Sequence, residues 1–151
     1  MAAVDFAFKK APSYRVASIR WTGPWSDESV HRHFLKVKKW AGTRHLRTGK
    51  WIFREPDDRK FEVAIEIKGK ARSEGDVHLR TFRGGTVASV VYDPRVIEPR
   101  VVYHGLSDFL RWRKKDHTIR GIGGYREVYS GDPWADPKAY ARTEVQILVK
   151  K

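Results

Sequence analysis

One segment of the sequence places a carboxylate between two aromatic rings. In Tyr125-Arg126-Glu127-Val128-Tyr129 the glutamate has a tyrosine two positions before it and another two positions after it. Alternate residues of a β-strand share a face, so in a strand both rings lie on the side of the glutamate. A partly desolvated carboxylate can pair with a cation, and ring faces add cation–π attraction of up to about 2 kcal/mol each. The pattern therefore predicts a site for a hydrophobic, cationic molecule with Glu127 as its counter-charge.

The same residues have a structural interpretation, in which Glu127 pairs with one of the many arginines and the tyrosines are ordinary half-buried strand residues. The spacing alone favours neither interpretation. Further aromatic residues are candidates for pocket walls, because six tryptophans exceed what a small core usually needs. The predicted ligand-binding set is Glu127, Tyr125, Tyr129, Trp21, Trp51, Tyr92 and Trp134.

Other kinds of site have weak support in the sequence. His31 and His33 are two apart on an expected helix and point in different directions, and the chain has no cysteine, so we expect no metal. The segment 121–124 (Gly-Ile-Gly-Gly) does not open a helix after a strand, as a dinucleotide-binding loop does, so we expect no cofactor. No serine or histidine lies in a nucleophile elbow.

Composition favours a soluble cytoplasmic protein. The 151 residues suit a single domain, and 40% hydrophobic residues are enough for a core. No apolar run reaches the roughly 18 residues of a membrane span, and residues 1–10 lack the apolar core of a signal peptide. Without cysteine the fold cannot depend on disulfides, so its stability must come from packing.

The net charge of +13 bears on possible partners. Lysines and arginines are spread along the chain, with modest clusters at 44–47 and 111–115 and no recognised nucleic-acid motif. This pattern favours a generally basic, solvated surface, and a nucleic-acid partner stays as an alternative. A basic protein repels a cation at long range, but screening within about 8–10 Å at physiological salt lets a local carboxylate dominate. An anionic or neutral ligand stays open.

The sequence runs through one plan twice. Three short echoes indicate pseudo-repeats over about 14–68 and 76–150, with a linker at 69–75. Each repeat has the pattern of a strand, a helix and two strands. We expect an α+β fold, in which a mainly antiparallel sheet carries two helices on one side and a central groove lies between the repeats. The echoes are Arg15–Ile19 with Thr86–Val90, Phe53–Glu55 with Tyr125–Glu127, and Phe61–Ile65 with Thr143–Ile147.

Local signals position the elements. The first strand is expected from Val16, and a helix follows Ser26, with Val30, Phe34, Val37 and Trp40 on its packing face. The pair Gly84-Gly85 suits a tight hairpin between strands at 77–83 and 86–92, and Pro99 opens the second helix. A strand is expected over 125–129, after Gly123-Gly124. Residues 131–140 are extra in the second repeat, and their turn formers predict a loop.

The chain resembles the GyrI-like, or AraC-effector-binding, family over nearly its full length. The resemblance implies paired strand-helix-strand-strand units around a groove, small-molecule binding (often of lipophilic cations), and a central glutamate that matches Glu127. Because only residues 1–13 precede the first expected strand, we expect a stand-alone domain rather than a complete transcription factor. The matching segments are Tyr14–Ala17 with Gly23-Pro24-Trp25, Gly84–Ala88, Tyr125–Tyr129 with Asp132-Pro133, and Thr143–Val149.

The resemblance also carries alternatives. Some stand-alone members are similar to cyclopropanoid cyclohydrolases, which would make Glu127 a general base and Tyr125 or Tyr129 a substrate-orienting group. The family's namesake implies DNA gyrase as a further possible partner. The chain departs from the family at 92–96, where Tyr92-Asp93-Pro94-Arg95-Val96 replaces a His-x-Gly-x-Tyr-like turn. The oligomeric state and the natural ligand do not follow from the sequence.

Overall fold

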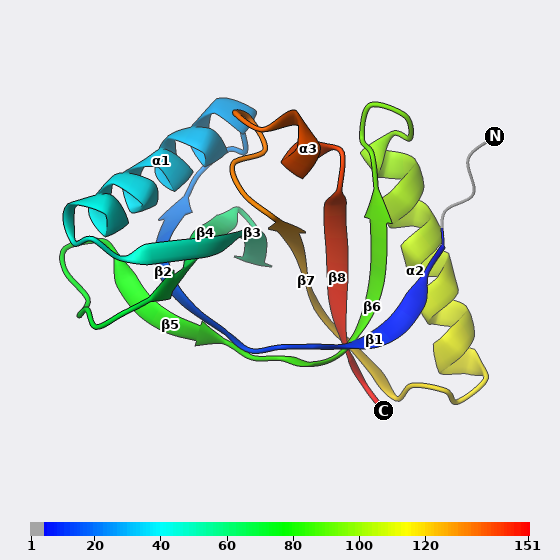
Figure 1. Ribbon diagram of the computed structural model, residues 1–151. Coiled ribbons are helices and arrows are strands. Elements are labelled where there is room, and N and C mark those ends of the chain that lie inside the picture. The colour runs from blue at the N-terminus through cyan, green and yellow to red at the C-terminus, as the bar shows by residue number, and fades with distance from the viewer. Residues whose placement is uncertain (1–4) are drawn as a thin grey trace.

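The computed structural model describes residues 5–151, which form one curved antiparallel sheet with its two long helices on one face (Figure 1). The strand order is β1-β6-β8-β7-β3-β4-β2-β5. The α+β prediction is confirmed. The elements are β1 (Ala7–Ala11), β2 (Tyr14–Thr22), α1 (Asp27–Thr43), β3 (Arg47–Asp57), β4 (Lys60–Lys68), β5 (His78–Phe82), β6 (Gly85–Tyr92), α2 (Pro99–Lys115), β7 (Gly121–Tyr129), α3 (Pro137–Tyr140) and β8 (Thr143–Lys150).

The two long helices begin where the sequence predicts. The Ser26 side chain accepts a hydrogen bond of 3.0 Å from the Ser29 amide and so caps α1, and Pro99 occupies the first turn of α2. The apolar face of α1 is buried against β2, β3 and β4. Leu106 and Leu110 of α2 are buried against β6 and β8. No helix within residues 5–151 has the length and apolar character needed to cross a membrane.

Strands β3 and β7 form the seam between the unit β2-α1-β3-β4 and the unit β6-α2-β7-β8. They pair antiparallel, with Trp51 opposite Tyr129 and Phe53 opposite Glu127. Trp51, Phe53 and Tyr129 contribute to the core under α1, so Glu127, which alternates with Val128, also faces the helices. The register therefore places the carboxylate on the helix-covered face, at the centre of the sheet.

The strand pairing aligns the two units differently from the sequence echo of Phe53–Glu55 with Tyr125–Glu127. Trp51 lies opposite Ile65 on β4, and Tyr125 lies opposite Ile147 on β8, the residue equivalent to Ile65 in the longer echoes. Tyr125 therefore corresponds to Trp51 rather than to Phe53, a shift of two residues from the echo. The shift keeps every side chain on its predicted face, because strand positions repeat every two residues, and a three-residue echo does not detect it.

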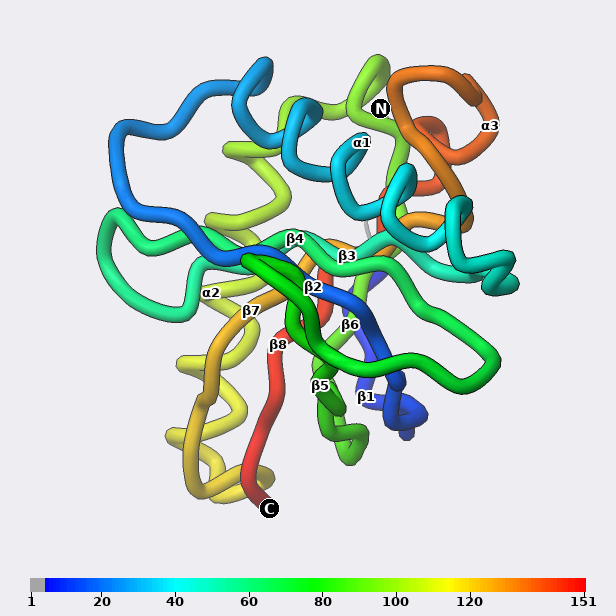
Figure 2. Tube along the Cα trace, turned by 90° about the vertical axis from the view of Figure 1, so that its left-hand side faces the viewer, coloured from blue at the N-terminus to red at the C-terminus, as the bar shows by residue number. Residues whose placement is uncertain are grey.

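The edge strands are exchanged between the units, which overturns the tight hairpin predicted at Gly84-Gly85. Strand β5 pairs with β2 rather than with β6, and β1 pairs with β6. The β1–β2 and β5–β6 connections meet on the side of the molecule away from α2 (Figure 2). A Cβ at Gly84 would lie 2.2 Å from the carbonyl oxygen of Ala11, so this glycine is needed for the close approach.

Three further predictions need correction. Strand β1 lies before the first strand that the sequence predicts. It was not predicted because its residues are mostly exposed and alternate only weakly between apolar and polar. Strand β7 begins at Gly121 rather than after Gly123-Gly124, and a register irregularity between Ile122 and Tyr125 accommodates the glycines. Residues 131–140 are not all loop, since Asp136 caps the short helix α3 by accepting a 3.0 Å hydrogen bond from the Lys138 amide.

We call β1 with its connection to β2, and β5 with its connection to β6, the two exchanged arms. Gly84→Ala is expected to lower the free energy of unfolding by about 1–3 kcal/mol, because the added Cβ overlaps the backbone of the other arm where the two arms cross. Urea unfolding followed by circular dichroism measures the change. Gly131→Ala is the control, since a Cβ there has no neighbour within 4 Å, and it should stay within about 0.5 kcal/mol of the parent. Equal stability of the two variants would contradict this account of the crossing.

Candidate functional site

Two tyrosine hydroxyls hold the Glu127 carboxylate. Tyr129, two residues further along β7, donates a hydrogen bond of 2.6 Å to Oε2, and Tyr103 of α2 donates to Oε1. Glu127 is half-buried, and none of the ion pairs among residues 5–151 includes it. The alternative in which an arginine neutralises Glu127 is therefore wrong. Both carboxylate oxygens therefore accept hydrogen bonds from neutral donors.

Four tyrosines lie within the electrostatic reach of Glu127. The pKa values of Tyr92, Tyr103 and Tyr129 are raised far above 10, first by burial and next by the negative charge of Glu127. The same two causes raise the pKa of Tyr125 to about 12. A raised phenol pKa favours the neutral form in the folded state, so this contribution to stability is complete below pH 10 and is lost as the pH rises through the raised values.

A cavity opens beside Glu127 on the side of α1. It measures about 80 Å³, and its walls are aromatic and apolar apart from two carboxylates, Glu127 and Asp27. A larger hollow of about 320 Å³ adjoins it and shares Asp27, Tyr129 and Trp134. Neither set of lining residues includes a lysine or an arginine. The cavity is lined by Trp25, Asp27, Val30, Phe34, Phe53, Glu127, Tyr129 and Trp134.

Trp134 lines both the cavity and the larger hollow. Its indole Nε1 donates a 3.0 Å hydrogen bond to Asp27 Oδ2 at the start of α1. Its ring stacks on His31 with centroids 4.4 Å apart and lies 5.9 Å from the ring of Phe34. The loop that carries Trp134 lies between α1 and β8, directly before α3 (Figure 1). One exposed hydrogen bond and ring stacking thus hold Trp134 over the cavity.

Of the sequence-predicted residues, Glu127, Tyr129 and Trp134 line the cavity, and Tyr125 instead lines a hollow beside Arg126. Tyr92 is buried in the core under α2 and lines neither the cavity nor the adjoining hollow. Tyr125 packs edge-on against Tyr103 with centroids 5.5 Å apart, and Tyr129 lines the cavity together with Trp134. Trp51 is instead a core residue, 4% exposed and stacked on Phe34.

Trp21 stacks on His33 at 3.9 Å and lines a separate hollow beside Arg20 and Lys60. Neither Trp21 nor Trp51 is among the residues that line the cavity beside Glu127. Both tryptophans lie on the helix face, but the cavity occupies only the part of that face next to the seam.

Several residues at the site were not singled out from the sequence. Tyr103 lies three and seven residues before Leu106 and Leu110, so helical periodicity places it on the buried face of α2. Asp27 has a helix-start signature that explains it without a ligand. Phe34 and Phe53 carry the ordinary signal of core residues. Tyr103 is therefore the residue that a closer examination of the periodicity would have found.

The family model of the GyrI-like small molecule binding domain matches residues 5–150 of the chain. The chain belongs to this family. The GyrI-like assignment agrees with the groove at the seam and makes the protein a small-molecule-binding domain. No curated protein matches the sequence.

Solved structures share the GyrI-like fold at low sequence identity. The EcmrR C-terminal domain superposes with a TM-score of 0.65 at 16% identity, over 99% of each chain. A hydrolase encoded by lin2189 from Listeria innocua gives 0.62 at 10% identity, over 96% of this chain and 91% of that one. SAV2435, bound to tetraphenylphosphonium, gives 0.54 at 11% identity, over 97% and 94%. EcmrR in its DNA complex gives 0.74 at 16% identity, and the present chain spans only 58% of that EcmrR chain.

The negative charge of Glu127 raises the pKa of Tyr125, so Glu127→Gln is expected to lower that pKa from about 12 toward the ordinary 10.0. The decrease is partial, because burial is the larger cause. Titration of the tyrosine ¹³Cζ resonances measures it. Glu74→Gln, at an exposed position paired with Arg44, is the control and should leave the Tyr125 pKa unchanged. An unchanged Tyr125 pKa in Glu127→Gln would contradict the assigned electrostatics.

Proposed function

We propose that this GyrI-like domain binds lipophilic cations, with Glu127 as the counter-charge and the surrounding aromatic rings as the walls. One observation carries the proposal. In a chain of net charge +13, the cavity at the seam has two carboxylates and no basic residue in its lining. A hollow on the other face is lined by Arg54, Arg83 and Arg126. The local field at Glu127 is thus opposite in sign to that of the protein as a whole.

The hydrogen bonding of Glu127 suits a counter-charge. An ionised carboxylate has about four acceptor positions, and the hydroxyls of Tyr103 and Tyr129 occupy two of them. The hydroxyls fix the orientation of the carboxylate without neutralising it. A large cation with its charge shielded by apolar groups can then interact with the carboxylate and with ring faces without forming hydrogen bonds of its own.

The size of the cavity implies that the site opens for such a ligand. Ligand pockets commonly measure roughly 300–1,000 Å³, far more than the 80 Å³ beside Glu127. The adjoining hollow of about 320 Å³ is of the right size, and Trp134 lines both spaces. Displacement of the indole would join them into one pocket with Glu127 at its base. Trp134 then acts as a lid that becomes a wall once the ligand is bound.

The relatives support the choice of ligand class. SAV2435 shares the fold and is bound to tetraphenylphosphonium, a cation covered by four phenyl rings. The same cation is a suitable probe here, because it cannot donate hydrogen bonds and reports on charge pairing and ring contacts alone.

Tetraphenylphosphonium is expected to quench the tryptophan fluorescence saturably, because Trp25 and Trp134 line the site. Glu127→Gln should weaken binding by about tenfold or more, since loss of the counter-charge removes at least roughly 1.4 kcal/mol. Glu74→Gln changes the net charge equally but lies outside the cavity, so it should bind as the parent does.

Absence of saturable quenching would overturn the proposal, as would equal weakening by Glu127→Gln and Glu74→Gln. Equal weakening would mean that only the overall charge of the protein matters.

The lid is expected to limit association. Trp134→Phe keeps a ring beside His31 and Phe34 but removes the N–H that donates to Asp27. Loss of a hydrogen bond worth roughly 1 kcal/mol should raise the association rate constant for tetraphenylphosphonium about fivefold in stopped-flow fluorescence. Trp112→Phe, at an exposed position on α2, should leave the rate constant unchanged. An association rate constant that is unchanged or lower in Trp134→Phe would show that Trp134 is not a lid.

A further inference from the structure

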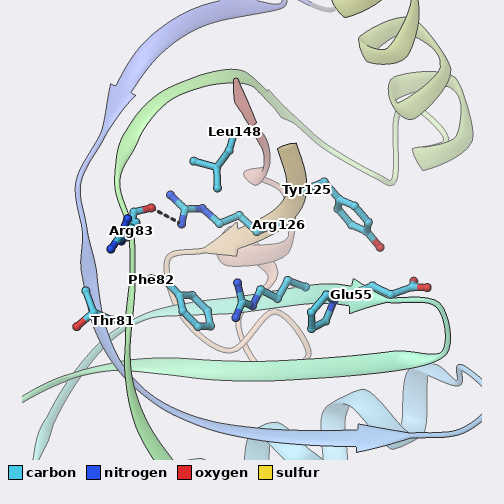
Figure 3. Close-up of a pocket in the computed structure, with 10 residues that line it drawn as sticks. Glu55, Thr81, Phe82, Arg83, Tyr125, Arg126 and Leu148 are labelled. Carbon is cyan, nitrogen blue, oxygen red and sulfur yellow. Dashed lines mark hydrogen bonds between the residues drawn. The ribbon is translucent and has the colours of Figure 1, made fainter. Parts of the chain in front are cut away.

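Another hollow lies mainly on the face of the sheet opposite to Glu127, and most of its charged lining residues are basic. It also reaches Glu55 and Tyr125, which share the face of Glu127. It measures about 460 Å³ and lies between β3, β7 and the crossing arms. Its lining includes three guanidinium groups, from Arg54, Arg83 and Arg126, together with apolar surface from Phe82 and Leu148. Figure 3 shows Arg126 extending toward Arg83 and Leu148, above the ring of Phe82.

Arg126 is buried without a carboxylate. It is only 4% exposed, and no ion pair among residues 5–151 includes it. Its Nε donates to Gln146 Oε1 at 2.8 Å and its Nη1 donates to the carbonyl of Arg83 at 3.2 Å. Its Nη2 is buried and has no hydrogen-bond partner. Burial is the largest effect on the pKa of Arg126 and lowers it; the positive charge of Arg54 also lowers it, whereas Tyr14 and Glu144 act in the opposite direction.

The neighbouring arginine shows what Arg126 lacks. Arg54 lies directly opposite Arg126 on β3, and both have a polar residue opposite them on the next strand. For Arg54 this residue is Glu62, which is fully buried and forms an ion pair with it, with 2.6 Å between Arg54 Nε and Glu62 Oε1. For Arg126 it is the neutral Gln146. Glu144 also lies on this face, but it pairs with Lys9 and accepts hydrogen bonds from Gln146 and Ser89. Of the two guanidinium groups that adjoin across the seam, only that of Arg54 has a paired carboxylate, that of Glu62.

That carboxylate is already shared. Glu62 also lies 3.3 Å from Nε of Arg20 and 3.2 Å from Nε of Arg80, so it faces three guanidinium groups. Glu55 also lines the hollow, but its carboxylate points away from the Arg126 guanidinium, on the side of Tyr125 (Figure 3). The hollow thus has an excess of positive charge, and buried charges are costly unless they are paired.

We propose that this hollow binds a small organic anion, a carboxylate or a phosphate monoester attached to an apolar group. The anionic oxygens would accept hydrogen bonds from Nη2 of Arg126, which is buried without a partner, and from the exposed side chain of Arg83. The apolar group would pack against Phe82 and Leu148. The site lies on the other face of the sheet from Glu127 and does not rest on the function proposed there.

The test uses the full chain and follows the Arg126 Nε–Hε resonance and the Leu148 methyl resonances by NMR. Benzoate and phenyl phosphate are the probes, and benzyl alcohol is the neutral counterpart. Either anion at millimolar concentration should shift both sets of resonances saturably, and benzyl alcohol should not. Arg83→Gln should weaken the binding about three- to tenfold, because it removes a charged donor at an exposed position that no other side chain depends on.

Arg32→Gln, at an exposed position on α1, is the matched control for loss of one positive charge. It should leave the affinity for benzoate unchanged, and so should Glu127→Gln, which separates this site from the cation site. Absence of saturable shifts with both anions would overturn the proposal. So would equal weakening by Arg83→Gln and Arg32→Gln, or an equal response to inorganic phosphate, which has no apolar group to use the wall of Phe82 and Leu148.

Discussion

The hydrogen bonds from Tyr103 and Tyr129 to Glu127 connect the parts of this structure on which binding depends. Tyr129 and Glu127 share one face of β7, and Tyr103 comes from α2, so the contact fixes the second helix against the seam. The pairing of β3 with β7 sets the face, because a slip of one residue would turn the carboxylate to the opposite side of the sheet. The core under α1 then leaves space beside the carboxylate rather than filling it.

The exchanged arms explain how the seam keeps its register. Strand β1 precedes the first unit in the chain but pairs with β6 of the second, and β5 precedes the second unit but pairs with β2 of the first. The two arms cross where Gly84 passes Ala11. The units therefore cannot separate without loss of strand pairing at both edges. Such a framework keeps β3 and β7 paired at the seam, and the loop that carries Trp134 is attached to α1 through a hydrogen bond from Trp134 to Asp27.

The two faces of the sheet differ in charge as a consequence of strand alternation. On β7, Glu127 and Tyr129 face the helices, and Arg126 faces the crossing arms. One five-residue segment thus supplies the acidic group of one hollow and the basic group of the other. The positive charge of the chain is compatible with a cation site, because the arginines next to the seam lie on the other side of the sheet.

Much of the fold follows from local signals, and the site follows from them only in part. The helix caps at Ser26 and Pro99 are local features, so the helices start as predicted. Alternation alone places Tyr125 and Tyr129 on the face of Glu127. Which strand lies beside β5 depends on the path of the whole chain, and the same glycine pair that suits a hairpin also suits a crossing.

Aromatic composition is also a poor guide to the cavity. Trp51 and Trp134 are the same residue type, yet one fills the core and the other covers the site. Only the packing of α1 against the sheet distinguishes them. Tyr103 is separated from Glu127 by 24 residues, and helical periodicity indicates that it is buried but not what it contacts.

A crystal structure of the chain with tetraphenylphosphonium would show directly whether Glu127 is the counter-charge of a cation site. We expect the phosphonium within about 6 Å of the Glu127 carboxylate, with Trp134 moved off Asp27 and its ring against a phenyl group. Density for the cation elsewhere on the molecule, or an unoccupied cavity with Trp134 still bonded to Asp27 under saturating ligand, would contradict that role of Glu127.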